Sequence, residues 1–233
     1  MTAGELAPGQ RVGDYEVVGA VGHGASGTVY EATHLTTSRR VALKVLQRAQ
    51  AASSVAVERL RREARIIAAL DHPHIVTLFE AGAQGSEPFL AMELLTGEGL
   101  DARLARERRL TVSAAVDLLL PVLDAVSSAH RRGVVHRDLK PANVFLARRG
   151  ADGEVTPKLL DFGLAKVLEG DASLTRSRTA VGTPFYMSPE QAYESRSVGA
   201  ASDQWSLAVV LYECVTGERP FEGQSVLAVL TAI

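Results

Sequence analysis

Glycines cluster in the segment Gly22-His23-Gly24-Ala25-Ser26-Gly27, which fits the pattern G-x-G-x-x-G. Glycine has no Cβ, so backbone N–H groups in such a segment can closely approach the oxygens of a phosphate. A dinucleotide-binding loop with this pattern opens a helix. Here Thr28-Val29-Tyr30 follows, and its β-branched and aromatic residues predict a strand. We interpret the glycines as the tip of a phosphate-binding β-hairpin, with a plain flexible hairpin as the alternative.

A second candidate for chemistry is an ion pair between Glu63 and Lys44. At helical spacing, Glu63 falls on the apolar face that includes Leu60 and Ile67. A carboxylate that faces the protein is costly unless a cation meets it. Lys44 lies in a neighbouring predicted strand, where alternation turns its side chain toward the interior. The alternative is a solvated Glu63 at the edge of the apolar face.

The most specific motif is His136-Arg137-Asp138-Leu139-Lys140-Pro141-Ala142-Asn143. Taking five specified residues at a frequency of about one in 20 each, a chance match in this chain is on the order of one in ten thousand. Further motifs follow it, namely Asp161-Phe162-Gly163, the segment from Gly182 to Glu190, and Asp203-Gln204-Trp205-Ser206. The order in which these motifs follow one another along the chain is further evidence that the matches are specific.

The secondary structure that must position these residues is predicted to be mainly strands in the first part of the chain and mainly helices in the second. Short β-branched or alternating runs predict strands over 15–21, 28–34, 40–46, 75–81 and 89–94, and helical spacing predicts a helix over 54–70. After Gly97-Glu98-Gly99 the pattern is helical, and the longest helix is predicted over 111–132, where Pro121 should produce a kink. The change near 94–99 predicts two lobes.

The composition excludes several classes of protein. The chain has 233 residues, of which 46% are hydrophobic and 22% charged, and this excludes a disordered chain. Its net charge of −2 provides no overall field toward nucleic acid or an anionic membrane. The single cysteine, Cys214, excludes an internal disulfide and suits a reducing cytoplasm. No run reaches the roughly 18 apolar residues of a membrane span, and residues 1–10 contain no signal peptide.

Taken in order, the motifs resemble those of the eukaryotic-like protein kinase domain, and of the bacterial serine/threonine protein kinases in particular. The resemblance covers nearly the whole chain from Tyr15 onward. It implies an α+β, bilobal fold. Residues 15–95 would form an N-terminal lobe with an antiparallel five-stranded sheet and one helix. Residues 96–233 would form a mainly helical C-terminal lobe that lacks its last helices, and residues 1–14 would be an N-terminal extension.

The resemblance also implies roles in transferring the γ-phosphate of ATP to serine or threonine hydroxyls of proteins. Asp138 is expected as the catalytic base, which orients the hydroxyl and accepts its proton. Lys140 is expected to reach the γ-phosphate as a point charge. Asn143 and Asp161 are expected to bind Mg²⁺, a hard cation that takes carboxylate and amide oxygens, with Mn²⁺ as an alternative ion.

The nucleotide is expected to bind through residues of both lobes. Lys44, held by Glu63, would contact the α- and β-phosphates. The further nucleotide-binding residues that the resemblance implies are Val21, Gly22, Gly24, Gly27, Val29, Ala42, Met92, Glu93, Leu95, Phe145 and Asp161. The glycines would cover the phosphates, and the apolar side chains would contact the adenine.

Regulation by phosphorylation is a hypothesis that rests on the segment between the motifs at 161–163 and 182–190. The candidate regulatory residues are Arg137, Thr175, Ser177, Thr179 and Thr183. A phosphate on a hydroxyl of this segment adds about −1.5 to −2 charge and could pair with Arg137, which would order the segment. The alternative is that these hydroxyls are ordinary polar groups of a loop.

Two departures from the family pattern concern the end of the peptide-substrate motif. Ser188 stands where the family usually has alanine before Pro189-Glu190, and the arginine that would pair with Glu190 is absent together with the final helices. The sequence therefore suggests a cytoplasmic fragment of a longer protein, whose remainder beyond Ile233 could carry a membrane anchor.

The intact catalytic set favours an active serine/threonine kinase. A kinase-like ATP-binding or scaffolding module, inactive in this form, is the alternative. A small-molecule phosphotransferase is a third interpretation, disfavoured because the segment from Gly182 to Glu190 resembles a peptide-substrate loop. The expected partners are ATP and protein substrates, with homodimerisation for autophosphorylation as a further expectation. Neither nucleic acid nor a membrane segment of this chain is expected.

Overall fold

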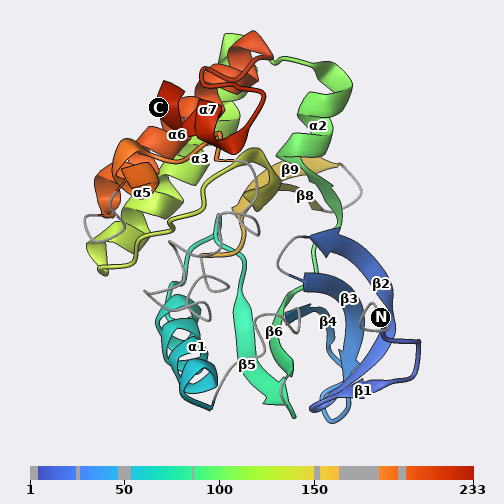
Figure 1. The fold of residues 1–233 in the computed structure, drawn as a ribbon. Coiled ribbons are helices and arrows are strands. Elements are labelled where there is room, and N and C mark those ends of the chain that lie inside the picture. The colour runs from blue at the N-terminus through green and yellow to red at the C-terminus, as the bar shows by residue number, and fades with distance from the viewer. Residues whose placement is uncertain are drawn as a thin grey trace. The chain divides into compact units, whose positions relative to one another are not determined.

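The structure is a computed structural model that describes residues 5–24, 27–46, 54–85, 87–149, 153–162, 184–193 and 198–233. Within these ranges the chain forms two compact units (Figure 1). The N-terminal unit contains residues 5–71 and 76–95, and the C-terminal unit contains residues 72–75, 96–162 and 184–233.

The N-terminal unit is a six-stranded antiparallel sheet in the order β1-β2-β3-β4-β6-β5, with one helix, α1, packed against β5. Its elements are β1 (Arg11–Val12), β2 (Tyr15–Gly24), β3 (Gly27–His34), β4 (Arg40–Leu46), α1 (Ser54–Ala68), β5 (Leu78–Gln84) and β6 (Glu87–Glu93). The expected number of five strands was therefore one too low. The additional strand is the two-residue β1, in which Val12 pairs with Tyr15 of β2. So short a strand has no periodicity for a sequence pattern to reveal.

Alternation along the strands builds the core of this unit. In β2 the side chains of Tyr15 and Val17 are buried, whereas Glu16 and Val18 are exposed, as expected for a strand with one face on the core. The ring of Tyr15 packs edge-on against Phe89 of β6, with 5.9 Å between the ring centroids. The strand predicted over 75–81 instead begins at Leu78, because Ile75 belongs to the C-terminal unit, where it forms a bridge with Leu159.

The glycine segment leads into a strand and not into a helix, because β3 begins at Gly27. Gly27 has a φ of +150°, and a Cβ built on it would lie 2.1 Å from the carbonyl oxygen of Val45. We expect Gly27→Ala to destabilise the chain by about 1–3 kcal/mol, because its backbone conformation disfavours a side chain and the neighbouring backbone must shift. Thermal unfolding should show a midpoint lowered by about 2–4 °C for each kcal/mol.

Gly22→Ala is the matched control for this prediction, since a Cβ at Gly22 would meet nothing within 4 Å. Equal midpoints for the two variants would contradict the close approach of Gly27 to β4.

The C-terminal unit is mainly helical and includes a small antiparallel sheet, β7-β8-β9. Its elements are β7 (Gly97–Gly99), α2 (Leu100–Glu107), α3 (Val112–Arg131), the 3-10 helix η2 (Pro141–Asn143), β8 (Val144–Arg149), β9 (Glu154–Leu159), α5 (Pro189–Tyr193), α6 (Ala200–Thr216) and α7 (Val226–Ala232). The hydroxyl of Thr111 caps α3 by accepting a hydrogen bond from the N–H of Ala114 at 3.2 Å. Pro121 lies inside α3, and the helix continues past it. The kink expected at Pro121 stays a prediction.

Helices α3 and α6 pack together as the core of this unit. Among the described residues, α3 is the one helix long and apolar enough to cross a membrane by length and composition, and its inner face is buried, as in the core helix of a globular domain. An apolar groove of about 470 Å³ runs between the two helices on their outer side, lined in part by Leu120, Leu123 and Leu211.

Trp205 lies on α6 near the start of that helix and is half-buried. Its ring stacks on Phe221, with 5.5 Å between the centroids and 12° between the planes. In the described part of the chain, its indole N–H is the only buried side-chain polar group without a hydrogen-bond partner. Stacking and apolar contacts therefore favour the burial of the ring, whereas the indole N–H contributes no hydrogen bond.

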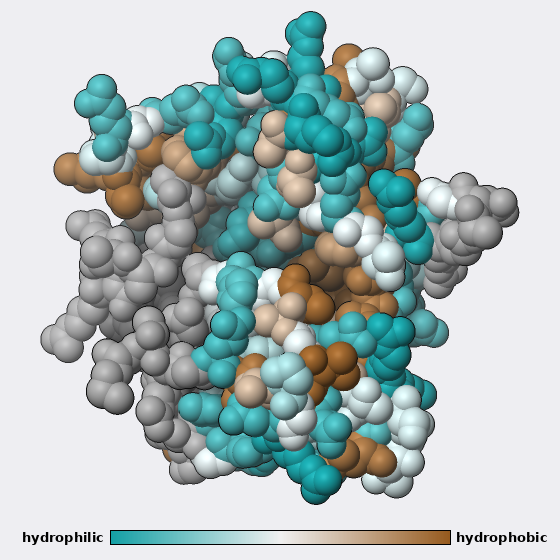
Figure 2. Space-filling view, turned by 90° about the vertical axis from the view of Figure 1, so that its right-hand side faces the viewer, coloured by the Kyte–Doolittle hydropathy of each residue, from teal (hydrophilic) through white to brown (hydrophobic). Residues whose placement is uncertain are grey.

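Charged side chains lie mainly at the surface. On the face drawn in Figure 2, hydrophilic residues make up most of the exposed area, and hydrophobic residues gather in smaller patches between them. The exposed ion pair between Arg106 of α2 and Glu98 of β7 is one such surface contact. The core residues of both units are therefore covered by polar surface over much of this face.

Candidate active site

Three of the predicted catalytic residues meet in the segment between α3 and β8. The ammonium group of Lys140 lies 2.8 Å from Oδ2 of Asp138. The amide nitrogen of Asn143, on η2, donates hydrogen bonds to the backbone oxygen of Asp138 at 2.7 Å and to its Oδ2 at 3.1 Å. The carboxylate of Asp138 is thus held in one orientation by an ammonium and an amide, and it is only partly exposed.

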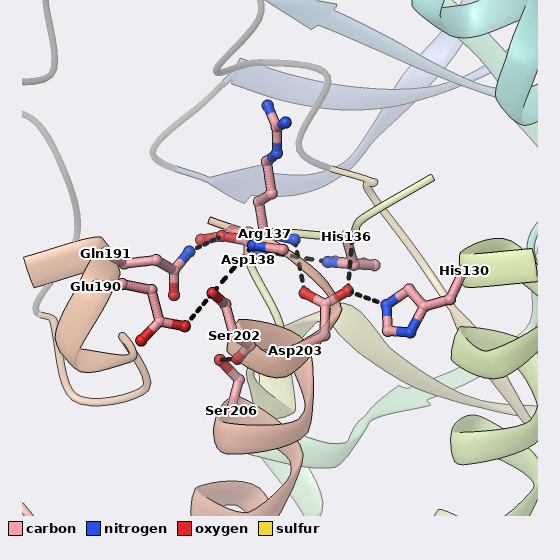
Figure 3. Close-up of polar contacts among 10 residues, drawn as sticks. His130, His136, Arg137, Asp138, Glu190, Gln191, Ser202, Asp203 and Ser206 are labelled. Atoms are coloured by element: carbon pink, nitrogen blue, oxygen red, sulfur yellow. Dashed lines mark hydrogen bonds and ion pairs between the residues drawn. The ribbon is translucent and has the colours of Figure 1, made fainter. Parts of the chain in front are cut away.

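A buried carboxylate on α6 anchors the backbone of this segment. Asp203 is 1% exposed and accepts hydrogen bonds from the backbone N–H groups of His136 at 2.8 Å and Arg137 at 2.9 Å (Figure 3). Its Oδ2 also lies 2.7 Å from Nε2 of His130, on α3. Charge-assisted bonds of this kind are stronger than bonds between neutral groups. The anchor fixes the two residues that precede Asp138.

Arg137 and Asp161 both adopt positive φ angles, of 65° and 50°. A residue other than glycine rarely adopts such a conformation, which persists only where the surrounding structure determines it. Arg137 directly precedes the predicted catalytic base, and Asp161 is itself a predicted metal ligand. Strained backbone conformations of this kind occur preferentially at functional sites.

The segment that carries Asp161 is joined to the catalytic segment by direct contacts. The backbone N–H of Leu160 donates to the carbonyl of Asn143 at 2.8 Å, and Nε2 of His136 lies 2.8 Å from the carbonyl of Leu160. The rings of His136 and Phe162 are 4.8 Å apart. Pairing of β8 with β9 produces this arrangement, because it places the end of β9 beside the end of η2. Asn143 and Asp161 therefore lie on adjoining segments.

The donor set fits a magnesium ion that is shared with a phosphate. The described contacts of the Asn143 amide use only its nitrogen, so its oxygen is left to ligate a cation. Among the described residues, no group of three or more histidine, cysteine, aspartate or glutamate side chains could form a closed metal cage. Mg²⁺ is usually bound through one or two carboxylates together with waters and substrate phosphates. The carboxylate of Asp161 and the amide oxygen of Asn143 are ligands of the kind that Mg²⁺ prefers.

His136 is buried, and burial lowers the pKa of its imidazole, although the charge of Asp203 acts in the opposite direction. At pH values below 6.5, the ordinary pKa of histidine, the imidazole of His136 gains a proton in the unfolded chain but not in the folded chain. We therefore expect His136 to make the free energy of unfolding fall with falling pH, by up to about 1.4 kcal/mol per pH unit. An NMR titration of the ring should give a midpoint below 6.5, and a midpoint at or above 6.5 would contradict the prediction.

The predicted phosphate-binding residues of the N-terminal unit lie opposite one another in the sheet. Gly22 of β2 pairs with Val29 of β3, and Val29 pairs with Lys44 of β4. Ala42 of β4 pairs with Met92 of β6. Residues at paired or alternating positions share one face of a sheet. The register therefore brings Val29, Ala42, Lys44 and Met92 to the same face.

Lys44 is 6% exposed, whereas Glu63 on α1 is half-buried. In the described part of the N-terminal unit, no ion pair joins Lys44 to Glu63. The pairing of these two residues therefore stays a prediction. Helical spacing placed Glu63 on the inner side of α1, and the structure places it at the edge of that side, next to the buried residues Leu60, Ala64 and Ile67.

The other predicted nucleotide-binding residues have different surroundings. Val21 is 56% exposed, beside Gly22 at an irregularity of the β2–β3 pairing. Glu93 ends β6, and its backbone N–H donates to the carbonyl of Thr77 at 2.9 Å. Leu95 follows β6 and is half-buried. Phe145 lies in β8 of the C-terminal unit, where it pairs with Gly99 and Lys158.

The predicted regulatory hydroxyls lie outside the described residues. These are Thr175, Ser177, Thr179 and Thr183. Gly163 of the Asp161 motif is outside them as well. Arg137, the proposed partner of a phosphate, is described, and its backbone is fixed by Asp203.

Sequence reasoning missed three contacts around the active-site segment. Glu190, expected to lack its arginine, is paired instead with the hydroxyl of Ser202, and this hydrogen bond lowers the pKa of Glu190. His130 supports Asp203, and Gln191 contacts the backbone of Arg137. The available signal was weak, because each residue is an ordinary polar residue until the fold brings distant helices together.

A cavity of about 410 Å³ lies beside the catalytic segment within the C-terminal unit. Lys140, Pro141 and Ala142 line one side of it, and side chains of α2 and of the end of α6, including Asp101 and Glu213, line the others. The cavity offers both charged and apolar surface, and Lys140 connects it to Asp138 through their 2.8 Å contact.

The sequence model of the protein kinase domain matches residues 15–232. The chain belongs to the protein kinase family. This kinase chain is 39% identical over 224 residues to the serine/threonine-protein kinase Pkn1 of Myxococcus xanthus. The matched residues make up 96% of this chain and 32% of Pkn1. The chain is 38% identical over 215 residues to the serine/threonine-protein kinase PknL of Mycobacterium tuberculosis, covering 92% of the chain and 52% of PknL.

Solved kinases confirm the fold class. The kinase domain of Mycobacterium tuberculosis PknI superposes with a TM-score of 0.77 at 29% identity, covering 95% of this kinase chain and 80% of that domain. The expectation of a bilobal α+β kinase fold is therefore confirmed, apart from the number of strands. The chain spans between about a third and a half of the length of Pkn1 and PknL. Membership of the family implies the use of ATP and a divalent metal ion in general terms.

Proposed function

We propose that the chain is the catalytic part of a protein that transfers the γ-phosphate of ATP to serine or threonine hydroxyls of other proteins. The observation that carries this proposal is the oriented carboxylate of Asp138, held by Lys140 and Asn143 on a segment that Asp203 anchors. The relatives described as serine/threonine-protein kinases support the same acceptor class.

Phosphoryl transfer depends on positioning and on the neutralisation of charge more than on covalent chemistry. In the proposed reaction the carboxylate of Asp138 orients the hydroxyl of the substrate and accepts its proton. Lys140, which contacts that carboxylate, provides a positive charge for the transferred phosphate. A bound magnesium ion, held by Asn143 and Asp161, would neutralise charge on the phosphate oxygens.

The N-terminal unit is proposed to bind the nucleotide. Backbone N–H groups at the β2–β3 hairpin would approach the phosphates, and Lys44 would contact them from β4. Val29, Ala42 and Met92 share the face of the sheet that carries Lys44, and they would provide its apolar surroundings.

Control of this activity by phosphorylation is a further part of the proposal. A phosphate on Thr175, Ser177 or Thr179 would add negative charge that the guanidinium of Arg137 can pair with. Formation of the pair between Lys44 and Glu63 would accompany activation, because catalysis in this family requires that pair. Phosphopeptide mapping after incubation with Mg²⁺ and ATP tests this part, and an unmodified segment in an active enzyme would exclude it.

The transfer reaction is tested with the full-length protein, labelled ATP, Mg²⁺ and a generic basic protein as acceptor. The expected result is label on serine or threonine after acid hydrolysis, and its loss when the metal ion is chelated. An inactive protein that still binds ATP would favour a kinase-like binding or scaffolding module instead.

A further inference from the structure

Helix α5 begins with a reciprocal pair of hydrogen bonds between Ser188 and Gln191. The backbone N–H of Gln191 donates to the hydroxyl oxygen of Ser188 at 3.4 Å, and the N–H of Ser188 donates to Oε1 of Gln191 at 3.1 Å. This is the capping box that the spacing S-x-x-Q favours, with Pro189 at the first helical position. The serine that departs from the usual alanine thus has a partner three residues later in the sequence.

The same glutamine side chain also reaches the catalytic segment. Its Nε2 donates a hydrogen bond to the backbone carbonyl of Arg137 at 2.9 Å (Figure 3). The two neighbours fix the orientation of the amide. Turned over, the amide would place its nitrogen against the N–H of Ser188 and its oxygen against the carbonyl of Arg137, and neither contact could form a hydrogen bond.

The carbonyl that Gln191 contacts belongs to a residue in an unfavourable conformation. Arg137 has a φ of 65°, its N–H is held by Oδ1 of Asp203, and its carbonyl is held by Gln191. The two peptide groups of Arg137 are thus fixed by side chains from two different helices, α6 and α5. Asp138 is the next residue, so the direction of its side chain depends on the peptide that Gln191 holds.

We propose that Gln191 is a positioning residue that fixes Asp138 relative to α5, through the carbonyl of Arg137, and that Ser188 orients the amide for this purpose. The inference rests on the proposed kinase activity and adds a residue to it. Loss of the contact allows the peptide between Arg137 and Asp138 to rotate, and small misplacements of a catalytic group are costly in rate.

Two substitutions separate this role from simple capping of α5. Gln191→Glu keeps an oxygen for the N–H of Ser188, but it replaces the donor to Arg137 by an acceptor. Gln191→Lys keeps a donor for the carbonyl of Arg137, but it removes the acceptor for Ser188. In the full-length protein we expect Gln191→Glu to lower kcat about 10-fold with the KM for ATP unchanged, and Gln191→Lys to stay within about 3-fold of the wild-type kcat.

A residue that only caps α5 gives the opposite order, in which Gln191→Glu is active and Gln191→Lys is impaired, and that result overturns the proposal. A second measurement does not depend on activity. The N–H of Asp138 lies 3.3 Å from Nδ1 of His136, so hydrogen exchange of this amide reports the geometry of the peptide. Exchange should become faster in Gln191→Glu than in Gln191→Lys, and equal rates overturn the inference. A wild-type protein that transfers no phosphate contradicts the proposed function alone, because the exchange measurement still decides the role of Gln191.

Discussion

Replacing Asp138 by asparagine is expected to lower the rate of phosphate transfer by about 10²–10⁴-fold, because the amide cannot accept the proton of the substrate hydroxyl. The side chain keeps its shape, and an amide oxygen can still accept hydrogen bonds from Lys140 and Asn143. We therefore expect the affinity for ATP, measured by equilibrium binding of a fluorescent nucleotide analogue, to change little.

Asp117→Asn is the matched control, since Asp117 is an exposed aspartate of α3 whose described contact is with the hydroxyl of Ser113. Its transfer rate should equal that of the wild-type protein. Comparable rates for Asp138→Asn and Asp117→Asn would show that the carboxylate of Asp138 is not the proton acceptor.

The largest effect on stability is expected for Asp203→Ala. The substitution removes the acceptor of two backbone N–H groups, those of His136 and Arg137, and the partner of His130. Losing one member of a buried charged contact costs on the order of 3–5 kcal/mol, because the remaining polar groups are left without partners. Urea unfolding followed by circular dichroism should show a midpoint lowered accordingly, together with loss of phosphate transfer.

Gln204→Ala provides the comparison for this second prediction, because Gln204 is the next residue on α6 and is exposed. Exposed substitutions of this kind usually change stability by less than about 0.5 kcal/mol. If Asp203→Ala unfolded at the same urea concentration as Gln204→Ala, then the segment around Asp138 would have to be anchored by other contacts.

Local patterns in the sequence were sufficient for the elements that present the site. The strand that follows Gly27 could be predicted because β-branched and aromatic residues gather there. The cluster of Asp138, Lys140 and Asn143 could be predicted because a short motif contains all three. Such features depend on neighbours within a few residues, so the information is contained in the sequence itself.

The contacts that sequence reasoning missed depend on residues far apart in the chain. Glu190 finds Ser202, and Gln191 finds Arg137, only because α5, α6 and the catalytic segment lie together. Nothing in the sequence around Gln191 distinguishes a capping residue from one that also reaches a distant carbonyl. The start of β5 was misplaced for a related reason, since Ile75 is drawn into the other unit by Leu159.

The stacking of Trp205 on Phe221 also has a spectroscopic consequence. Trp205 is the only tryptophan of the chain and belongs to the C-terminal unit. Its emission should therefore report the melting of α6 and its surroundings, whereas opening of the β-sheet unit should leave the signal unchanged. Fluorescence and circular dichroism recorded on one sample can then distinguish a single cooperative transition from two, and they require no extrinsic label.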